Sequence, residues 1–294
     1  MIKIDLNEYY NNGGIERIIQ FINDTVFDKE EIYDFIFPDD ENFYFDNNDL
    51  FELIYYEFKY LKINYKESDG CLYFSSKNND YIYLVKAKDE VKNVIIKENT
   101  KRIATNAFYQ NNNLKNVLIL STNLYIANHA FYFDDKLEKV VFKNNNKISL
   151  AWASIAYCSN LKNIILSEAA YEFNSSFIDF CELNNFMIPT KAVLHFGCFK
   201  NSNIKKLYVP KKYKDLSKYG ISLNTNIYYE DDGNKLLLRN EINQVVETQD
   251  DYAHNFHTSS GSFSSTTIHN DEVYANRKCD HSFVKKEDFL KNYN

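Results

Sequence analysis

Residues 91–209 repeat one pattern of apolar and polar positions six times. Every copy begins with an apolar anchor that two polar residues follow, and the anchors are Val91, Leu114, Leu137, Leu161, Leu183 and Ile204. From Leu114 onward the anchors are 23, 24, 22 and 21 residues apart. A near-constant period in this range is typical of solenoids, in which each unit buries its apolar face against the next. The spacing therefore predicts a stack of coils.

Each copy opens with a short alternation of apolar and polar residues. The positions three and five residues after the anchor are apolar in every copy and rich in β-branched and aromatic side chains. The first of these columns contains Val94, Val117, Val140, Ile164, Phe186 and Leu207, and the second contains Ile96, Ile119, Phe142, Leu166, Ile188 and Val209. Alternation with a period of two predicts one short strand per copy, with both columns facing the core.

The segment before each anchor carries further columns. Small residues stand at Ala107, Ala130, Ser154, Ser176 and Gly197, and large or apolar residues follow them at Phe108, Phe131, Ile155, Phe177 and Cys198. This pairing favours a tight turn or a single helical turn, where only a small side chain fits against the next coil. An earlier column reads Ile103, Ile126, Leu150, Glu172 and Val193. Glu172 interrupts it, and we expect Phe173 to supply the apolar group.

These columns resemble the BspA-type leucine-rich repeat, whose pattern reads approximately I-x-x-x-A-F-x-x-C-x-x-L-x-x-I-x-I-P. Close matches are Ile103-Ala107-Phe108-Leu114-Val117-Ile119 and Ile126-Ala130-Phe131-Leu137-Val140-Phe142. Cys158 occupies the cysteine column, and Pro189 and Pro210 occupy the proline column, whereas the other copies lack the cysteine and four lack the proline. The resemblance implies an α/β solenoid over about residues 91–229, a leucine-rich repeat array of short parallel strands with turn or helical-turn returns.

The chain before the repeats predicts two further parts. Residues 1–66 favour a small α-helical N-terminal region. Its first helix follows Gly13-Gly14, its second is capped by Asp28 and ended by Pro38, and its third begins at Asn48 or Asp49. Residues 67–90 favour a hairpin, with strands at 71–75 and 81–85, that caps the array and pairs with the first repeat strand.

The chain after the repeats predicts a second cap and a tail. Pro210 fits the start of a helix that Gly220 ends, and residues 227–229 fit a closing strand, so 211–229 are expected to form the C-terminal cap. This ending also resembles the way in which BspA-type arrays finish. Residues 230–294 include a Ser/Thr-rich run at 257–267 and favour a partly flexible tail.

Strand alternation also predicts an outward face. The position four residues after the anchor is apolar in all copies, at Ile95, Leu118, Val141, Ile165, Met187 and Tyr208. The polar column two residues after the anchor contains Asn93, Asn116, Lys139, Asn163, Asn185 and Lys206. At about 4.8 Å per strand, the apolar column spans roughly 24 Å, enough for a peptide or one helix. We expect these columns, centred on Leu118, Val141, Ile165 and Met187, to bind a protein partner. The alternatives are that the chain's own termini cover the column, or that strand propensity alone filled it.

Composition and charge narrow the classes of partner and compartment. The net charge of −7 disfavours nucleic acid as a partner. Apolar stretches of 18 or more residues do not occur, so membrane insertion is not expected, and the N-terminus lacks the pattern of a secretory signal. Five scattered cysteines give no disulfide framework and fit buried thiols in a reducing compartment. We therefore expect a cytoplasmic protein. The alternative is a cell-surface protein, or one secreted by a signal-independent route.

Candidate chemistry is sparse. His254, His257, His269, Cys279 and His281 are zinc-ligand types in the tail, but their spacing fits no common zinc finger, and a polar tail is the simpler interpretation. The pair Asp134-Asp135 fits a solvated turn better than acid–base chemistry. Phosphate loops and H-E-x-x-H motifs are absent from the sequence. We predict a non-enzymatic protein-interaction module without a cofactor. A surface-associated adhesion or structural protein is the first alternative, and a metal-binding or enzymatic role of the N-terminal region or tail is the second.

Overall fold

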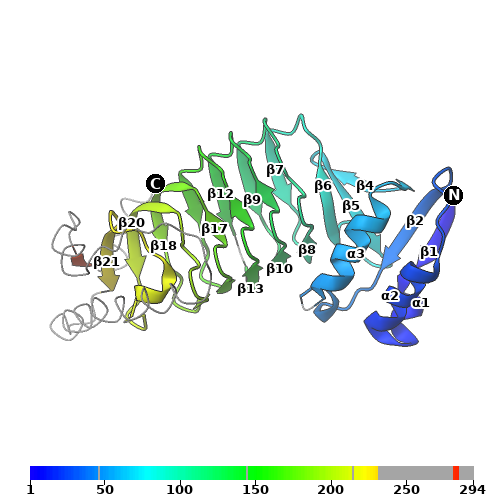
Figure 1. The fold of residues 1–294 in the computed structure, drawn as a ribbon, viewed down its shortest axis with the longest axis horizontal. Helices are drawn as coiled ribbons and strands as arrows, with labels where there is room; N and C mark the ends of the chain where they lie inside the picture. Colours follow the sequence, from blue (N-terminus) through cyan, green and yellow to red (C-terminus); the bar gives the residue numbers. More distant parts are fainter. Residues whose placement is uncertain (46, 144, 214, 231–280, 285–294) are drawn as a thin grey trace, which may run out of the picture.

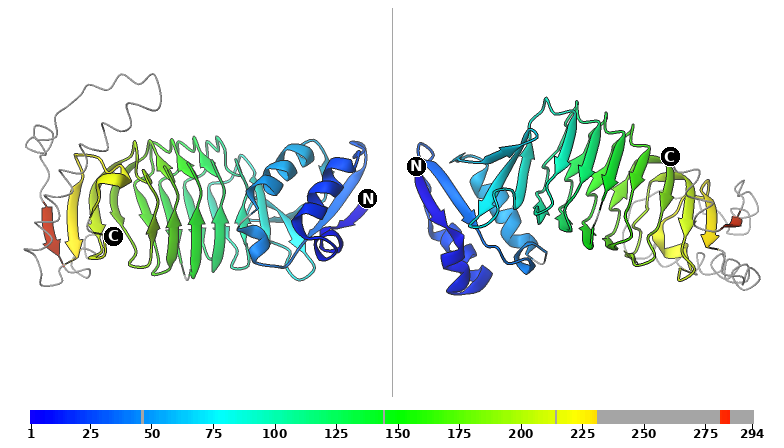
Figure 2. Two further views of the ribbon diagram at one scale, coloured as in Figure 1. Left: turned by 60° about the horizontal axis from the view of Figure 1, so that its bottom comes forward. Right: turned by 180° about the vertical axis from the view of Figure 1, so that it is seen from behind.

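The computed structural model describes residues 1–45, 47–143, 145–213, 215–230 and the backbone of 281–284. The repeats form a row of stacked coils with the N-terminal region at one end (Figure 1). Two long sheets follow the row on different sides of the coils, and a short three-stranded sheet lies on a further side. Figure 2 shows the coil strands lying side by side along the whole array. The predicted leucine-rich repeat solenoid is confirmed.

The first sheet contains the predicted repeat strands. Its strands from the first coil to the last are β7 (Asn93–Ile96), β9 (Asn116–Ile119), β12 (Lys139–Phe142), β15 (Asn163–Ile165), β18 (Glu182–Met187), β20 (Asn203–Val209), β21 (Asn226–Glu230) and β22 (His281–Val284). All of these pairings are parallel, and equivalent columns face each other, as Val94, Val117 and Val140 do. One repeat therefore contributes one strand, as the alternation predicts.

The second sheet has eleven strands and joins the repeats to the N-terminal region. Its main path is β1 (Ile2–Asp5), β2 (Ile32–Phe37), β5 (Cys71–Ser76), β6 (Tyr83–Ala87), β8 (Arg102–Ile103), β10 (Asn123–Ile126), β13 (Lys147–Leu150), β16 (Ala170–Phe173) and β19 (Val193–Leu194). The strands β3 (Lys62–Ile63) and β4 (Lys66–Ser68) pair with β2 and β5. Because one sheet crosses the junction, the two parts share a continuous backbone ladder.

The return segments carry strands where the sequence predicted tight or helical turns. The strands β11 (Phe131–Tyr132), β14 (Ile155–Ala156) and β17 (Ile178–Asp179) form the short sheet. Backbone N–H groups on this side donate to the next coil, from Phe131 to the Ser154 carbonyl at 2.9 Å and from Ile155 to the Phe177 carbonyl at 2.8 Å. Buried backbone groups need such partners, and in a stack the neighbouring coil supplies them.

The inward columns form a single continuous core. The anchors and the columns three and five residues after them are all buried, and the core extends from Leu6 to Tyr229. Stacked rings link neighbouring coils, with the Phe108 and Phe131 centroids 4.6 Å apart. Full burial of one such side chain contributes about 1.5–3 kcal/mol, so each coil depends on its neighbours for stability.

Phe173 takes the place of Glu172 in the apolar column, as expected. Phe173 is fully buried and pairs with Leu150, which restores the apolar column. The same shift applies one coil later, where Leu194 pairs with Phe173 and Val193 is exposed. The shift therefore extends to the next coil, where Leu194 rather than Val193 lies beside Phe173.

The N-terminal region is not purely helical. The helices α1 (Leu6–Asn11), α2 (Gly14–Asp24) and α3 (Asn48–Phe58) are present, and α2 and α3 match two predicted helices. The predicted helix between Asp28 and Pro38 is wrong, because Ile32–Phe37 is strand β2, parallel to β1. The spacing of Ile32, Phe35 and Ile36 fits a helix, whereas Tyr33, Phe35 and Phe37 alternate with the period of a strand. Packing decides for the strand, since Phe35 stacks on Phe58 of α3 with centroids 4.2 Å apart.

The predicted hairpin is present as β5 and β6, but its predicted partner is wrong. Strand β6 pairs in parallel with β8 rather than with the first repeat strand β7. The hairpin therefore extends the second sheet. Its register places Leu84 beside Ile103, in line with the inward column of the following coils.

The C-terminal cap is only partly as predicted. The expected helix after Pro210 is replaced, within the described residues, by the single 3-10 turn η2 (Ser217–Tyr219). Three side chains of this segment, Tyr213, Leu216 and Tyr219, are buried against the last coil. Their spacing of three residues therefore does not require a helix here. Gly220 ends the turn as predicted, with φ +73° and too little room beside the Lys200 backbone for a Cβ atom. The closing strand is β21, and most of the tail, 231–280 and 285–294, lies outside the described residues.

Arg102 connects the N-terminal region to the array. It belongs to β8, and its fully buried guanidinium lies between the rings of Phe51 and Tyr125, 4.1 and 4.2 Å from their centroids. Nη1 donates to the Tyr44 carbonyl at 2.7 Å, and Nη2 donates to Asn48 Oδ1 at 2.8 Å. Burial lowers the pKa of Arg102 to about 10, so the side chain stays charged at neutral pH. Its planar, forked donor geometry serves both rings and both acceptors at once.

We predict that Arg102→Lys lowers the free energy of unfolding by about 2–4 kcal/mol, because a lysine cannot stack between two rings and donate to both acceptors. Urea denaturation followed by circular dichroism measures the change. Arg17→Lys is the matched control, since Arg17 is exposed on α2. Equal and small effects of the two substitutions would show that the Arg102 contacts do not hold the junction together.

Candidate binding surfaces

The outward face of the first sheet follows the predicted alternation over its first four strands. The polar column is exposed or partly exposed, and Asn116 Nδ2 donates to Asn93 Oδ1 at 2.8 Å across neighbouring strands. In the apolar column, Ile95 is 40% exposed, and Leu118, Val141 and Ile165 are half-buried. Parallel register places these four side chains side by side. They form a narrow apolar surface, which we call the sheet-face column.

The last two predicted members of that column are not available as surface. Met187 and Tyr208 are only 6% and 1% exposed, and they pack together with Ile165 and Tyr228 in a cluster separate from the main core. The sheet continues past Tyr208 into β21, whose Tyr228 lies directly beside it. Tyr208 is therefore an interior position of the sheet, and at this end the chain itself covers the column, which is one of the alternatives stated for it.

A second surface, which the sequence columns did not predict, lies on the side of the coils that carries the short sheet. Seven rings from four successive coils form a continuous series of contacts with centroids 4.5–6.0 Å apart. We call them the aromatic strip, and its members are Tyr109, His129, Tyr132, Phe133, Trp152, Tyr157 and Phe180.

Four rings of the aromatic strip are well exposed to solvent. Tyr109, Phe133, Trp152 and Phe180 are 46, 36, 50 and 51% exposed. With about 200 Å² of surface for each aromatic side chain, these four expose about 370 Å². This is the size at which an exposed apolar patch on a soluble protein is often functional. His129 keeps the strip uncharged at neutral pH, because burial lowers the pKa of its imidazole.

A column of small polar or sulfur-bearing side chains runs inside the coils. Its buried members are Asn111, Asp134, Cys158, Cys181 and Ser202. The Asn111 N–H donates to Asp134 Oδ1 of the next coil at 2.9 Å, and Cys158 Sγ lies 3.6 Å from the Phe131 carbonyl oxygen. The cysteines are free and buried thiols, as expected, within the described residues.

The repeat columns, this inner column included, and the stacked coils match a known protein family. The profile of the BspA type leucine-rich repeat region matches residues 83–205 and 157–228, with six copies. The repeat region belongs to the BspA-type leucine-rich repeat family. Curated protein sequences include no match to the chain.

The corners of the BspA-type array hold some of its aromatic residues in an uncommon backbone conformation. Phe133, Tyr157 and Phe180 have φ angles of 60°, 55° and 48°. The equivalent corner is Gln110 in an earlier coil and Asn201 in the last, also with positive φ. Bulky residues pay roughly 1–2 kcal/mol for this left-handed conformation, whereas asparagine tolerates it. The aromatic rings are therefore placed at these corners against local backbone preference.

Sequence reasoning missed the aromatic strip for an identifiable reason. Its members lie between the columns that define the BspA-type repeat, so the pattern of core positions does not mark them. Aromatic residues do recur four or five positions before the anchor, at Tyr109, Tyr132, Phe133 and Tyr157, with Phe180 three before it. That recurrence was a readable signal, although only the stacked coils show that these rings touch.

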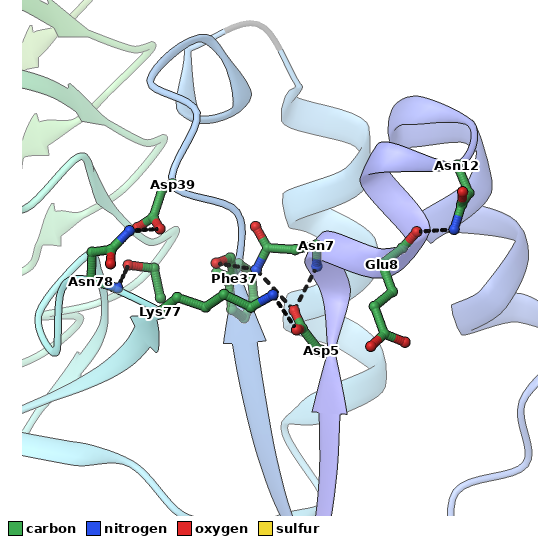
Figure 3. A network of polar contacts seen from close by, with 9 residues as sticks. Asp5, Asn7, Glu8, Asn12, Phe37, Asp39, Lys77 and Asn78 are labelled. Carbon is green, nitrogen blue, oxygen red and sulfur yellow. Dashed lines mark hydrogen bonds and ion pairs between the residues drawn. The ribbon is translucent and has the colours of Figure 1, made fainter.

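The N-terminal region contains a polar cluster at the ends of its parallel strands (Figure 3). Asp5 Oδ1 accepts the Asn7 N–H at 3.0 Å and so caps α1, while Asp5 Oδ2 pairs with Lys77 Nζ at 2.8 Å. Burial alone would raise the pKa of Asp5, but the hydrogen bonds from Lys77 and Asn7 outweigh it and lower that pKa. Asn7 also donates to the Phe37 carbonyl at 3.1 Å. These contacts tie β1, β2 and β5 together, which explains the cluster as structural.

The metal and histidine hypotheses gain no support in the described part of the chain. His254, His257, His269 and Cys279 lie outside it, and only the backbone of His281 is described. Among the described residues, the potential ligand side chains do not gather into a group of three or more. His195 Nε2 lies 3.0 Å from Glu172 Oε1 on the surface. The described helices also include none of the length and hydropathy that a membrane span needs.

Asp134 corrects the prediction of a solvated acidic turn. Asp135 is exposed, but Asp134 is fully buried, and among the described residues its Oδ2 has no hydrogen-bond partner. Burial raises the pKa of the Asp134 carboxyl to about 8, against a hydrogen bond from Asn111 that lowers it. The carboxyl is enclosed in the core of the BspA-type array rather than in a cleft, so its raised pKa concerns stability.

We predict that Asp134→Asn raises stability at pH 8 by an amount on the order of a few kcal/mol and that the gain disappears near pH 4. The folded-state pKa of Asp134 is above the unfolded value of about 3.9, so protonation favours the folded state. That contribution is complete below the unfolded pKa and is lost as the pH rises through about 8. Thermal denaturation of both proteins between pH 4 and 8 measures the difference. The exposed control Asp135→Asn should show little pH-dependent gain, and an identical profile for the two variants would contradict the prediction.

Proposed function

We propose that this protein is a non-enzymatic protein-interaction module whose main docking surface is the aromatic strip. Leucine-rich repeat solenoids are in general protein-interaction modules, and the chain carries such a solenoid. The choice of surface is our own inference, and it rests on the exposure and backbone conformation of the rings.

The single observation that carries the proposal is the presence of exposed rings at strained corners. Phe133 and Phe180 are 36% and 51% exposed at positive φ, whereas Asn201 occupies the equivalent corner of the last coil. Core packing does not explain rings that point to solvent, and their backbone conformation costs stability. Binding is the benefit that offsets such a cost, because aromatic side chains dominate the energetics of protein interfaces.

The arrangement of the rings indicates the kind of partner. Tyr157 and Phe180 stack with planes 22° apart, and Tyr109 and Tyr132 stack with planes 14° apart. In these two stacked pairs the neighbouring ring covers a face of each ring, so the ring edges remain to contact a partner. Ring edges carry partial positive charge and favour the faces of other aromatic rings. The partner surface is therefore expected to be apolar and aromatic, with few charges at its centre.

The sheet-face column is the second candidate surface. Ile95, Leu118, Val141 and Ile165 lie in line on four adjacent strands, beside the polar column that includes Asn116 and Lys139. With three spacings of about 4.8 Å, the column spans roughly 14 Å, which corresponds to about two and a half turns of a partner helix. Its half-buried side chains expose less apolar area than the aromatic strip, which is why we rank it second.

We predict that Phe133→Asn combined with Phe180→Asn abolishes capture of the partner while leaving the protein at least as stable as the unsubstituted chain. Asparagine relieves the left-handed corners by up to about 1 kcal/mol each and removes two exposed rings. Quantitative affinity capture from the native cell, compared between variants, measures binding, and thermal denaturation measures stability.

Two controls make the comparison specific. Tyr60→Asn removes a ring that is 66% exposed next to the end of α3 and that is not among the ring contacts of the strip within the described residues, so this variant should keep full capture. Leu118→Asp combined with Ile165→Asp disrupts only the sheet-face column. Loss of capture in that variant alone would assign docking to the sheet face. Retained capture in both double variants would contradict both surfaces.

A further inference from the structure

A cavity of about 390 Å³ lies where α3, the β5–β6 hairpin and the first coil meet. Its apolar wall comes from all three parts, with Phe58 from α3, Phe74 and Val85 from the hairpin strands, and Ala104 and Tyr109 from the first coil. This volume lies within the range of about 300–1,000 Å³ that is usual for small-molecule sites. The cavity is separate from the sheet-face column, and it meets the aromatic strip only at Tyr109.

Two tyrosines place polar groups in this apolar wall. Tyr65 and Tyr83 both line the cavity, and Tyr83 is only 2% exposed. Both rings contact Phe74, with centroids 5.2 Å away for Tyr65 and 5.8 Å away for Tyr83, so they extend the aromatic wall. Burial raises the pKa of Tyr65 to about 12, so its hydroxyl remains protonated and able to donate.

Two lysines stand at the opening. Lys59 and Lys86 line the cavity and are exposed to solvent. Lys59 lies near the rings of Tyr56 and Tyr60, and Lys86 makes no ion pair in the part of the chain that the structure describes. Acidic side chains are absent from the cavity lining. The opening is therefore positively charged although the protein as a whole carries a net charge of −7.

We propose that the cavity binds an amphipathic carboxylic acid, with its apolar body between α3 and the hairpin and its carboxylate at Lys86. The apolar aromatic wall accommodates a hydrocarbon body, and the lysines complement an anionic head through charge-assisted hydrogen bonds. A cationic ligand is disfavoured by the same lysines. Because the wall includes residues of both the N-terminal region and the first coil, an occupied cavity also stabilises their junction.

The test compares three probes with the same ten-carbon body, namely decanoate, decanol and decyltrimethylammonium, by isothermal titration calorimetry on the full chain. Decanoate is expected to bind at one site and to raise the melting temperature. Decanol is expected to bind about tenfold more weakly, since it lacks the charge-assisted contact, and decyltrimethylammonium is expected not to bind. Equal affinity for decanoate and decanol, or no binding of decanoate, would overturn the proposal.

Variants locate the site. Lys86→Gln should weaken decanoate about tenfold without changing decanol binding, and the exposed control Lys136→Gln should change neither. Val85→Trp fills the cavity and should abolish binding of both probes in a protein that circular dichroism shows to be folded. Decanoate affinity that survives both Lys86→Gln and Val85→Trp would place the binding elsewhere, on the aromatic strip for example, and would overturn the assignment.

Discussion

Parallel backbone pairing between successive coils is the constraint on which the rest of the structure depends. Each side of a coil donates to and accepts from the next coil, as the N–H of Phe131 does to the carbonyl of Ser154. Such pairing is possible only when equivalent residues lie in register at about 4.8 Å. Each side chain therefore lies beside the equivalent side chain of the next coil. All residues of one column share the same environment, which is the core, the solvent or a corner of the coil.

A stack of this kind has two ends, and each end needs a different solution. At the N-terminal end, the second sheet continues through β6, β5, β2 and β1, so the first coil is paired rather than exposed. Arg102 reinforces this junction by occupying the space between Phe51 and Tyr125. At the other end, Tyr213 and Tyr219 cover the last coil, and β21 continues the first sheet. These caps explain why the core is continuous from Leu6 to Tyr229.

The same stacking that buries apolar columns also aligns outward ones into surfaces. Single rings such as Phe133 and Phe180 would be unremarkable on a globular protein, but here register brings them into one series with Tyr157 between them. The inner column illustrates the opposite outcome, since the position that holds Cys158 holds Asp134 one coil earlier. A carboxyl in that column is buried whatever its own preference, which raises its pKa.

The sequence by itself determined the repeat, its period and its inward columns, because burial against neighbouring coils imposes one apolar pattern on every copy. It also determined α2 and α3, whose apolar spacing fits only a helix. Tertiary structure decided the cases in which local pattern was ambiguous: Ile32–Phe37 became a strand because it packs between β1 and β5. It alone decided the burial of Asp134 and Tyr208, the pairing of β6 with β8, and the assembly of the aromatic strip. Those outcomes depend on which residues of the adjacent coil or strand lie beside each position. A contact between residues about 23 positions apart leaves no local pattern in the sequence.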